Sequence, residues 1–516
     1  MRGSLLVAGT TSDAGKSVLT AGICRWLARA GVRVAPFKAQ NMSNNSMVAP
    51  DGAEIGRAQW MQAAAAGVPA EAAMNPVLLK PGSDKRSHLV VMGHPAGEAS
   101  AAGYWGSGEG RARLFDTVLA AYDDLRARFD VVVCEGAGSP AEINLRRNDI
   151  VNMGLARARG LPVIVAGDID RGGVFAALFG TLALLSAADQ ALVSGFVVNK
   201  FRGEQALLAP ALRRLRELTA RPVLGVVPWL PGIWLDAEDA VVVERSPMII
   251  PNGGCAPVAA RDVLRVGVIR LPRISNFTDV DALAIEPGVA VRFVASAAEV
   301  AEADLVVVPG TRATISDLGW LRERGLDAAL ARRAAAGRPV LGICGGYQIL
   351  GGLIHDGVES TSPVASGLGL LPVTTRFAAD KVLGRPCGYA GQLPVAGYEI
   401  HHGEVRVTGG SPWFTSAPGG GDALDGCRLG SVDGTLWHGV LENDAFRQAY
   451  LSEVALAAGL DWKPVPGTSF EAARQAQFDL LADAVERHLD TGALLRLIGE
   501  GPTPGMPAVR PALGPA

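Results

Sequence analysis

The chain has 516 residues, of which 49% are hydrophobic and 19% are charged, so its composition is that of a folded protein of two or three domains and excludes a disordered chain. The net charge of −3 gives no electrostatic reason to expect nucleic-acid binding. Six cysteines are spread along the chain without a CxxC pair, which argues against a disulfide framework or a zinc site and favours the cytoplasm. The first apolar run stops at Gly9 and continues into a loop. We therefore expect a β-strand there rather than a signal peptide, and we find no stretch apolar for long enough to cross a membrane.

Short β-branched segments alternate with longer Ala/Leu/Arg-rich segments in the first half of the chain. The expected strands span residues 4–7, 33–37, 131–134, 162–166, 192–198 and 223–227. Helices are expected between them, for example over 17–30 and 112–129. This alternation predicts βαβ units and an α/β fold with a doubly wound, mostly parallel sheet.

A second α/β series follows a stretch rich in Pro, Gly and Asn at 246–262, which predicts a linker. Its expected strands span 264–269, 305–308 and 339–343. An amphipathic helical segment and a Pro/Gly-rich end come after it. We therefore expect a first domain over 1–245, a second over 263–455, a C-terminal helical segment over 456–498 and a disordered tail over 499–516.

The first motif is a glycine-flanked loop between the first strand and the first helix. It has the spacing Gly9-x5-Gly15-Lys16-Ser17, one residue longer than the common phosphate loop. Backbone N–H groups of such a loop cradle phosphates, a lysine bridges the terminal phosphates, and a hydroxyl binds Mg²⁺. We expect ATP to contact Thr10, Asp13, Ala14, Gly15, Lys16 and Ser17. The alternative is a glycine turn that carries an incidental lysine.

The longer loop resembles that of the dethiobiotin synthetase family. That resemblance implies a P-loop NTPase-like domain that uses ATP and Mg²⁺ to phosphorylate a carboxyl group, which a nitrogen nucleophile then attacks. It also implies roles for three further residues. Glu135, in an EGAG-like segment, would join Ser17 as a Mg²⁺ ligand, and Asn199 would read adenine. Lys38 would lie near the phosphates or the substrate carboxylate.

The second motif is a cysteine between an apolar strand and a helix start. Cys344 has glycines two residues before it and directly after it, which permits the tight turn that exposes a nucleophile. A thioester made from glutamine needs a thiolate, a base and an oxyanion hole. We expect the base to be His438 and the oxyanion donors to be the backbone N–H groups of Gly345 and Gly310. The alternative for Cys344 is a small buried side chain.

This half resembles the class I glutamine amidotransferases, and specifically the branch found in the vitamin B12 amidating synthases. The resemblance implies a flavodoxin-like domain in which Cys344 and His438 act together. The branch lacks the usual glutamate, so the third member of the site stays open. Glu442 lies too far from His438 for that role. The GYEIH-type segment at 397–401 also resembles the branch, but its role stays open.

The domain order is that of both B12 amidating synthases. Segments 38–46, 76–81, 135–144, 168–175 and 199–203 resemble the branch that amidates the b, d, e and g carboxylates of (adenosyl)cobyrinic acid a,c-diamide. That resemblance implies L-glutamine and a corrinoid as substrates, with neither nucleic acid nor a membrane as partner. Candidate contacts to the anionic corrinoid are Lys38, Asn41, Asn44, Lys80, Arg171 and Lys200.

Three alternatives remain open: the synthase that amidates the a and c carboxylates, a cell-wall amidating enzyme, and a regulatory P-loop ATPase with a non-catalytic second domain. Intact Cys344 and His438 argue against the last. Because free ammonia would be protonated and lost in water, we also expect a sheltered passage between the two reaction sites.

Overall fold

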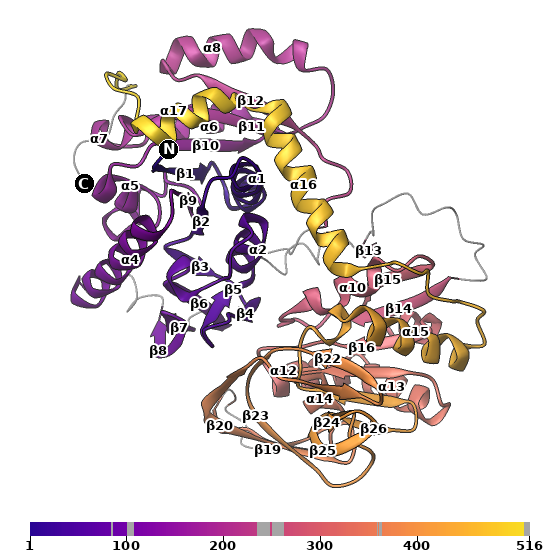
Figure 1. Cartoon of the computed structure of the whole chain (residues 1–516). Helices are drawn as coiled ribbons and strands as arrows, with labels where there is room; N and C mark the ends of the chain where they lie inside the picture. The colour runs from indigo at the N-terminus through magenta and orange to yellow at the C-terminus, as the bar shows by residue number, and fades with distance from the viewer. Residues whose placement is uncertain are drawn as a thin grey trace. The chain divides into compact units, whose positions relative to one another are not determined.

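The computed structural model describes residues 1–83, 86–100, 108–234, 248–249, 263–358, 360 and 364–509 (Figure 1). The chain forms two compact units. The first comprises Met1–Ser43, Ala49–Leu235 and Gln475–Ala516, and the second comprises Asn44–Val48 and Asp236–Arg474. The predicted linker over 246–262 lies outside the described residues, apart from 248 and 249.

Six parallel strands form the central sheet of the first unit, in the order β12-β11-β10-β1-β9-β2 (Figure 1). Each lies where the sequence predicts a strand: β1 (Gly3–Gly9), β2 (Val34–Phe37), β9 (Val131–Glu135), β10 (Val163–Asp168), β11 (Val193–Phe201) and β12 (Val223–Pro228). Their residues are mostly buried, as expected when helices cover both faces of a parallel sheet. The carboxyl ends of these strands meet at one edge, where α/β sheets bind ligands.

The helices of this unit connect those strands. They are α1 (Lys16–Arg29), α2 (Arg57–Ala66), α4 (Gly108–Arg128), α5 (Met153–Arg159), α6 (Val174–Ala183), α7 (Ala187–Gln190) and α8 (Ala209–Thr219). A smaller sheet, which the sequence did not predict, has the order β3-β6-β7-β8. Its strands are β3 (Gln40–Met42), β6 (Val77–Ser83), β7 (Arg86–Val91) and β8 (His94–Ser100).

The C-terminal helices α16 (Phe470–His488) and α17 (Thr491–Glu500) return to the first unit, which α16 enters at Gln475. Val485, Leu494 and Ile498 join the same hydrophobic core as Leu5 and Val7 of β1. The expected disordered tail begins at 499, yet the chain is ordered as far as Val509, whose backbone N–H donates to Gln190 Oε1 at 2.7 Å. Residues 510–516 lie outside the described part.

A seven-stranded sheet forms the centre of the second unit, in the order β13-β15-β14-β16-β17-β27-β26. The five inner strands are parallel, and the two outermost ones run antiparallel to their neighbours. The strands are β13 (Met248–Ile249), β14 (Leu264–Ile269), β15 (Val289–Val294), β16 (Leu305–Val308), β17 (Val340–Ile343), β26 (Cys427–Leu429) and β27 (Val432–Thr435). The predicted mostly parallel architecture is therefore confirmed for both units.

The helices of the second unit are α10 (Asp281–Ala284), α11 (Ala297–Glu302), α12 (Thr314–Glu323), α13 (Leu326–Ala335), α14 (Gly345–Leu350) and α15 (Asp444–Ala458). Two four-stranded sheets complete it, with the orders β19-β18-β20-β23 and β22-β21-β24-β25. The sequence analysis did not predict these two sheets. Their strands are β18 (Leu353–His355), β19 (Val364–Ser366), β20 (Val373–Gly384), β21 (Cys387–Ala390), β22 (Leu393–Ala396), β23 (Glu399–Val407), β24 (Phe414–Ala417) and β25 (Gly420–Asp425).

Candidate functional site

The glycine-flanked loop of the first unit has the geometry of a phosphate-binding loop. It leaves β1 at Gly9, makes one turn of 3-10 helix over Ser12–Ala14, and enters α1 at Lys16. Gly15 has φ +87°, and a Cβ atom there would lie 2.2 Å from Asn199 Nδ2, so only glycine fits. The Lys16 ammonium donates to the carbonyl oxygens of Thr11 (2.9 Å) and Ser12 (3.1 Å). Its charge therefore lies over the loop where phosphates would bind.

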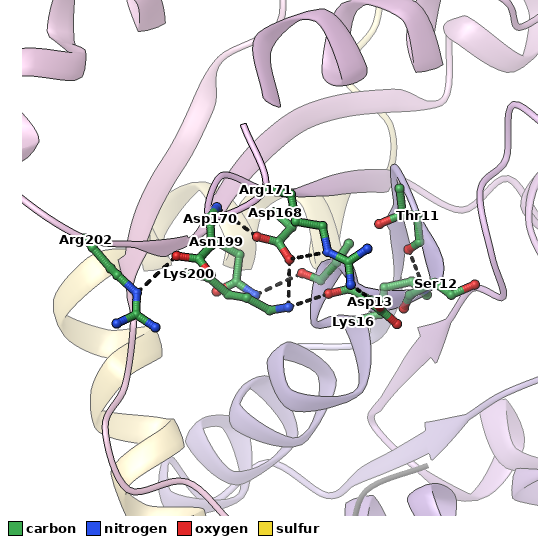
Figure 2. A network of polar contacts seen from close by, with 11 residues as sticks. Thr11, Ser12, Asp13, Lys16, Asp168, Asp170, Arg171, Asn199, Lys200 and Arg202 are labelled. Carbon is green, nitrogen blue, oxygen red and sulfur yellow. Dashed lines mark hydrogen bonds and ion pairs between the residues drawn. The ribbon is translucent and has the colours of Figure 1, made fainter. Parts of the chain in front are cut away.

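A network of charged side chains lies beside the loop (Figure 2). Lys200 Nζ donates to Asp13 O at 2.7 Å and to Asp168 Oδ2 at 2.8 Å. Arg171 pairs with Asp13 and lies 3.8 Å from Asp168 Oδ2. Asn199 Nδ2 donates to Ala14 O at 2.9 Å. Asn199 thus lies next to the loop, as its expected adenine-reading role requires, and the candidate corrinoid ligands Arg171 and Lys200 lie there too.

The two candidate Mg²⁺ ligands, Ser17 and Glu135, contact each other. Glu135 ends β9, is 1% exposed, and its Oε1 accepts a hydrogen bond from Ser17 Oγ at 2.7 Å. Lys38 Nζ donates to the same oxygen at 3.0 Å, and Gln62 Nε2 donates to Oε2 at 2.6 Å. A hydroxyl and a carboxylate at one point beside a phosphate loop fit the oxygen preference of Mg²⁺. Sequence reasoning missed Gln62, because no motif marks it on α2.

Three further candidate corrinoid ligands are Lys80, Asn41 and Asn44. Lys80 is 2% exposed and forms a buried ion pair with Glu54, its Nζ 2.5 Å from Oε1. Its charge is therefore compensated by a carboxylate in this structure, and its role toward the corrinoid stays a prediction. Asn41 Nδ2 donates to Gln59 Oε1 at 2.9 Å within the first unit, whereas Asn44 belongs to the segment of the second unit.

Cys344 occupies a strained turn between β17 and α14. Its φ of +51° is rare for a residue other than glycine. Its backbone N–H donates to Thr435 O at 2.7 Å, and a Cβ atom on Gly346 would lie 1.8 Å from Val308 O, so the helix approaches β16 closely. Strain of this kind at an expected nucleophile supports a catalytic role for Cys344 over a packing role.

His438 and Asp279 complete the site around Cys344. Asp279 Oδ2 lies 2.7 Å from His438 Nδ1, and Asp279 Oδ1 accepts from Gly439 N at 2.9 Å. Cys344 also acts on the imidazole of His438. Burial by itself lowers the pKa of His438, but the charges of Asp279 and Cys344 outweigh burial and raise that pKa to about 10. The site can therefore hold His438 in its protonated, imidazolium form at neutral pH.

Asp279 is the structure's candidate for the third member that the sequence left open. It lies in the short 3-10 helix Phe277–Val280, in the connection that leaves β14. Sequence reasoning searched downstream of His438 and so did not find an acid 159 residues upstream. Glu442, which the sequence analysis set aside, accepts at Oε2 a hydrogen bond from Arg474 Nη2 at 2.8 Å.

The two expected oxyanion donors come from neighbouring strand ends. A Cβ atom on Gly310 would lie 3.1 Å from His438 Cε1, and one on Gly345 would lie 2.9 Å from Thr311 N. Ser275 N donates to Gly310 O at 2.9 Å, and Thr311 Oγ1 donates to Asp317 Oδ2 at 2.5 Å. These bonds fix the turn after β16 beside the Cys344–His438 pair.

The GYEIH-type segment lies against the same histidine. The rings of Tyr398 and His438 stack with centroids 5.2 Å apart, and their backbones exchange hydrogen bonds of 2.9 and 3.0 Å. His401 is buried while His402 is half-buried, in keeping with opposite faces of a strand. Within the described ranges no cluster of three or more His, Cys, Asp or Glu side chains is arranged to hold a metal. The segment thus orients the imidazole.

None of the helices in the described part of the chain combines the length and the apolar character needed to span a bilayer. The described cysteines, Cys24, Cys134, Cys344, Cys387 and Cys427, are free thiols. Burial raises the pKa of Cys24 and Cys134, which disfavours their reactive thiolate form.

Comparison with known proteins gives consistent matches for both halves. Residues 5–240 match the family described as CobQ/CobB/MinD/ParA nucleotide binding domain, and residues 265–446 match the CobB/CobQ-like glutamine amidotransferase domain. The cobyric acid synthase of Frankia casuarinae is 61% identical to this chain, and that of Streptomyces avermitilis is 60% identical. Each alignment covers 99% of both proteins. The corresponding protein of Mycolicibacterium gilvum is 58% identical over 98% of this chain and 99% of its own length.

Proposed function

The chain belongs to the cobyric acid synthase family, and from this premise we propose that it moves the amide nitrogen of glutamine onto a corrinoid at the expense of ATP. The acceptors would be the b, d, e and g carboxylates of (adenosyl)cobyrinic acid a,c-diamide, and the product (adenosyl)cobyric acid. The observation that carries the proposal is the joint presence, in one chain, of the Cys344–His438–Asp279 arrangement and the Lys16 phosphate loop.

The second unit would release ammonia from glutamine. The Cys344 thiolate attacks the amide carbon of the glutamine side chain, and the developing oxyanion would be stabilised by the backbone N–H groups of Gly310 and Gly345. His438 donates its proton to the departing nitrogen, leaving a thioester on Cys344. The neutral imidazole then takes a proton from water, which attacks the thioester and frees glutamate. Asp279 holds Nδ1 and so aims Nε2 at the sulfur.

The first unit would activate the corrinoid carboxylate. Backbone N–H groups from Thr10 to Ser17 would hold the triphosphate, with Lys16 at its terminal phosphates. Ser17 and Glu135 would hold Mg²⁺, which would supply charge neutralisation at the phosphates. A corrinoid carboxylate oxygen attacks the γ-phosphorus and ADP leaves. Ammonia then attacks the acyl carbon, inorganic phosphate leaves, and an amide remains.

The alternatives are less well supported. A regulatory ATPase would not need a strained cysteine that acts on a histidine held by an aspartate. A synthase for the a and c carboxylates has the same domain order, but the relatives compared above carry the name cobyric acid synthase and are 58–61% identical over almost the full chain.

Mass spectrometry of corrinoid products tests the proposal. The purified chain, incubated with the a,c-diamide, ATP, Mg²⁺ and glutamine, is expected to give stepwise products, each with one OH replaced by NH₂, and to stop after the b, d, e and g positions. A parallel incubation with cobyrinic acid tests the a and c carboxylates. Amidation of those two positions alone would overturn the proposal in favour of the a,c-diamide synthase.

A further inference from the structure

A cavity of about 200 Å³ adjoins the phosphate loop in the first unit. Gly15, Asn199 and Lys200 line it beside the loop, and most of its remaining lining is apolar. Figure 2 shows Asn199 and Lys200 close to the turn that carries Asp13 and Lys16. An apolar cavity with a few polar groups at one end is the usual form of a small-molecule site.

The polar end suits a purine base. Asn199 Nδ2 is fixed by Ala14 O, and Asn199 Oδ1 has no hydrogen-bond partner among the described residues, so it can accept from an exocyclic amino group. Trp229 supplies an aromatic face. The guanidinium of Arg202 lies 4.0 Å from the centroid of the Trp229 ring and is itself held by Asp170 Oδ1 at 3.0 Å.

One wall of this cavity comes from the C-terminal helix α16. Leu481, Ala484 and Val485 line the cavity, and their spacing places them on one face of the helix. These residues lie far beyond residue 240, where the match to the nucleotide-binding family ends. The C-terminal segment therefore supplies this wall, whereas the other lining residues belong to the region that carries the phosphate loop.

The position of this wall is fixed by close packing of α16 on α1. A Cβ atom on Gly22 would lie 3.0 Å from both Leu481 O and Val485 Cγ2, so glycine lets the two helices approach closely. Arg25 Nε donates to Asp479 Oδ1 at 2.9 Å, and Arg29 Nη1 donates to Asp483 Oδ1 at 2.7 Å. Because α1 starts at the phosphate loop, a helix held on α1 keeps a constant distance from a bound triphosphate.

We propose that α16 forms one wall of the base site for the purine nucleoside triphosphate bound by the phosphate loop. The C-terminal segment then takes part in nucleotide binding: its apolar face covers the base while Asn199 meets the base edge. This inference rests on the proposed function, in that it assumes ATP is the nucleotide.

The test distinguishes binding of the base from binding of the phosphates. Isothermal titration calorimetry of the full chain, in the presence of Mg²⁺, measures the binding of two probes. These are ATP and inorganic tripolyphosphate, which lacks a base. Ala484→Phe fills the cavity from α16 and is expected to raise the Kd for ATP about tenfold or more, while the Kd for tripolyphosphate changes less than about twofold. Ala476→Phe, on the exposed side of the same helix, is the matched control and should leave both constants unchanged.

The outcomes are distinguishable. Unchanged ATP binding in Ala484→Phe, with wild-type ATP binding intact, would overturn the base site alone. Wild-type protein that binds neither probe would overturn the proposed ATP-dependent function itself. If Ala484→Phe loses tripolyphosphate as well, its fold has been disturbed, and the smaller Ala484→Val decides by the same comparison.

Discussion

At the residue scale, the charge of Asp279 sets the state of the glutamine site. It approaches His438 Nδ1 to 2.7 Å and raises the pKa of the imidazole. Asp279→Asn keeps the shape but removes the charge, and is expected to lower the glutaminase kcat about a thousandfold or more. Ammonia-driven amidation, which bypasses this site, should persist. Glutamate release measured beside corrinoid amidation checks this.

The matched control for that substitution is Glu442→Gln. Glu442 lies four residues after His438 but pairs with Arg474, so its loss should leave glutamine hydrolysis nearly unchanged. Equal losses of glutaminase activity in Asp279→Asn and Glu442→Gln would show that the site tolerates no nearby change of charge. Such a result would contradict the special role given to Asp279.

Protonation of His438 makes the stability of the folded protein depend on pH. The pKa of His438 rises from the ordinary 6.5 to about 10 on folding, so the folded state binds its proton more tightly than the unfolded state does. The resulting stabilisation is complete below about pH 6.5 and is lost as the pH rises to about 10. The Tm difference between wild type and His438→Gln is therefore expected to shrink from pH 6.5 to pH 10. A difference that grew with pH would contradict this sign.

Single residues were predictable where a local motif marks them. Cys344 and Lys16 stand in glycine-flanked turns after apolar strands, so their chemistry shows in neighbouring residues. Asp279 and Gln62 carry no such mark, because only the fold brings them to His438 and Glu135. Lys80 lies in a family-like segment, and only the fold shows that its charge is paired with buried Glu54.

At the element scale, the strands of both parallel sheets follow from periodicity, whereas the docking of the C-terminal helices does not. Strands buried on both faces read as continuous apolar runs, and these are visible in the sequence. The helices α16 and α17 are amphipathic, and an amphipathic face does not say which surface it covers. The short antiparallel strands of the second unit were missed because their residues are mixed in polarity and partly exposed.

A substitution at Gly225 tests how closely the C-terminal segment packs against the first unit. A Cβ atom there would lie 2.0 Å from His488 O, at the end of α16, so Gly225→Ala is expected to destabilise the first unit by about 1–3 kcal/mol. Gly180, inside α6, has nothing within 4 Å of such an atom, and Gly180→Ala should stabilise by about 0.5–1 kcal/mol. Urea unfolding of both variants checks the opposite signs; a stabilising Gly225→Ala would contradict the packing.

At the scale of the whole molecule, each reaction has its own unit and its own nucleophile, so the two chemistries are separable. Cys344→Ala removes the thiol that acts on His438 and is expected to abolish glutamine-dependent amidation. The phosphate loop, Ser17 and Glu135 lie in the first unit and are unchanged. Amidation driven by ammonium salts should therefore remain, and should rise with pH as ammonium loses its proton. Corrinoid products with each nitrogen source, measured by mass spectrometry, check this. A folded Cys344→Ala protein that used neither source would show that the thiol is needed for more than nitrogen supply.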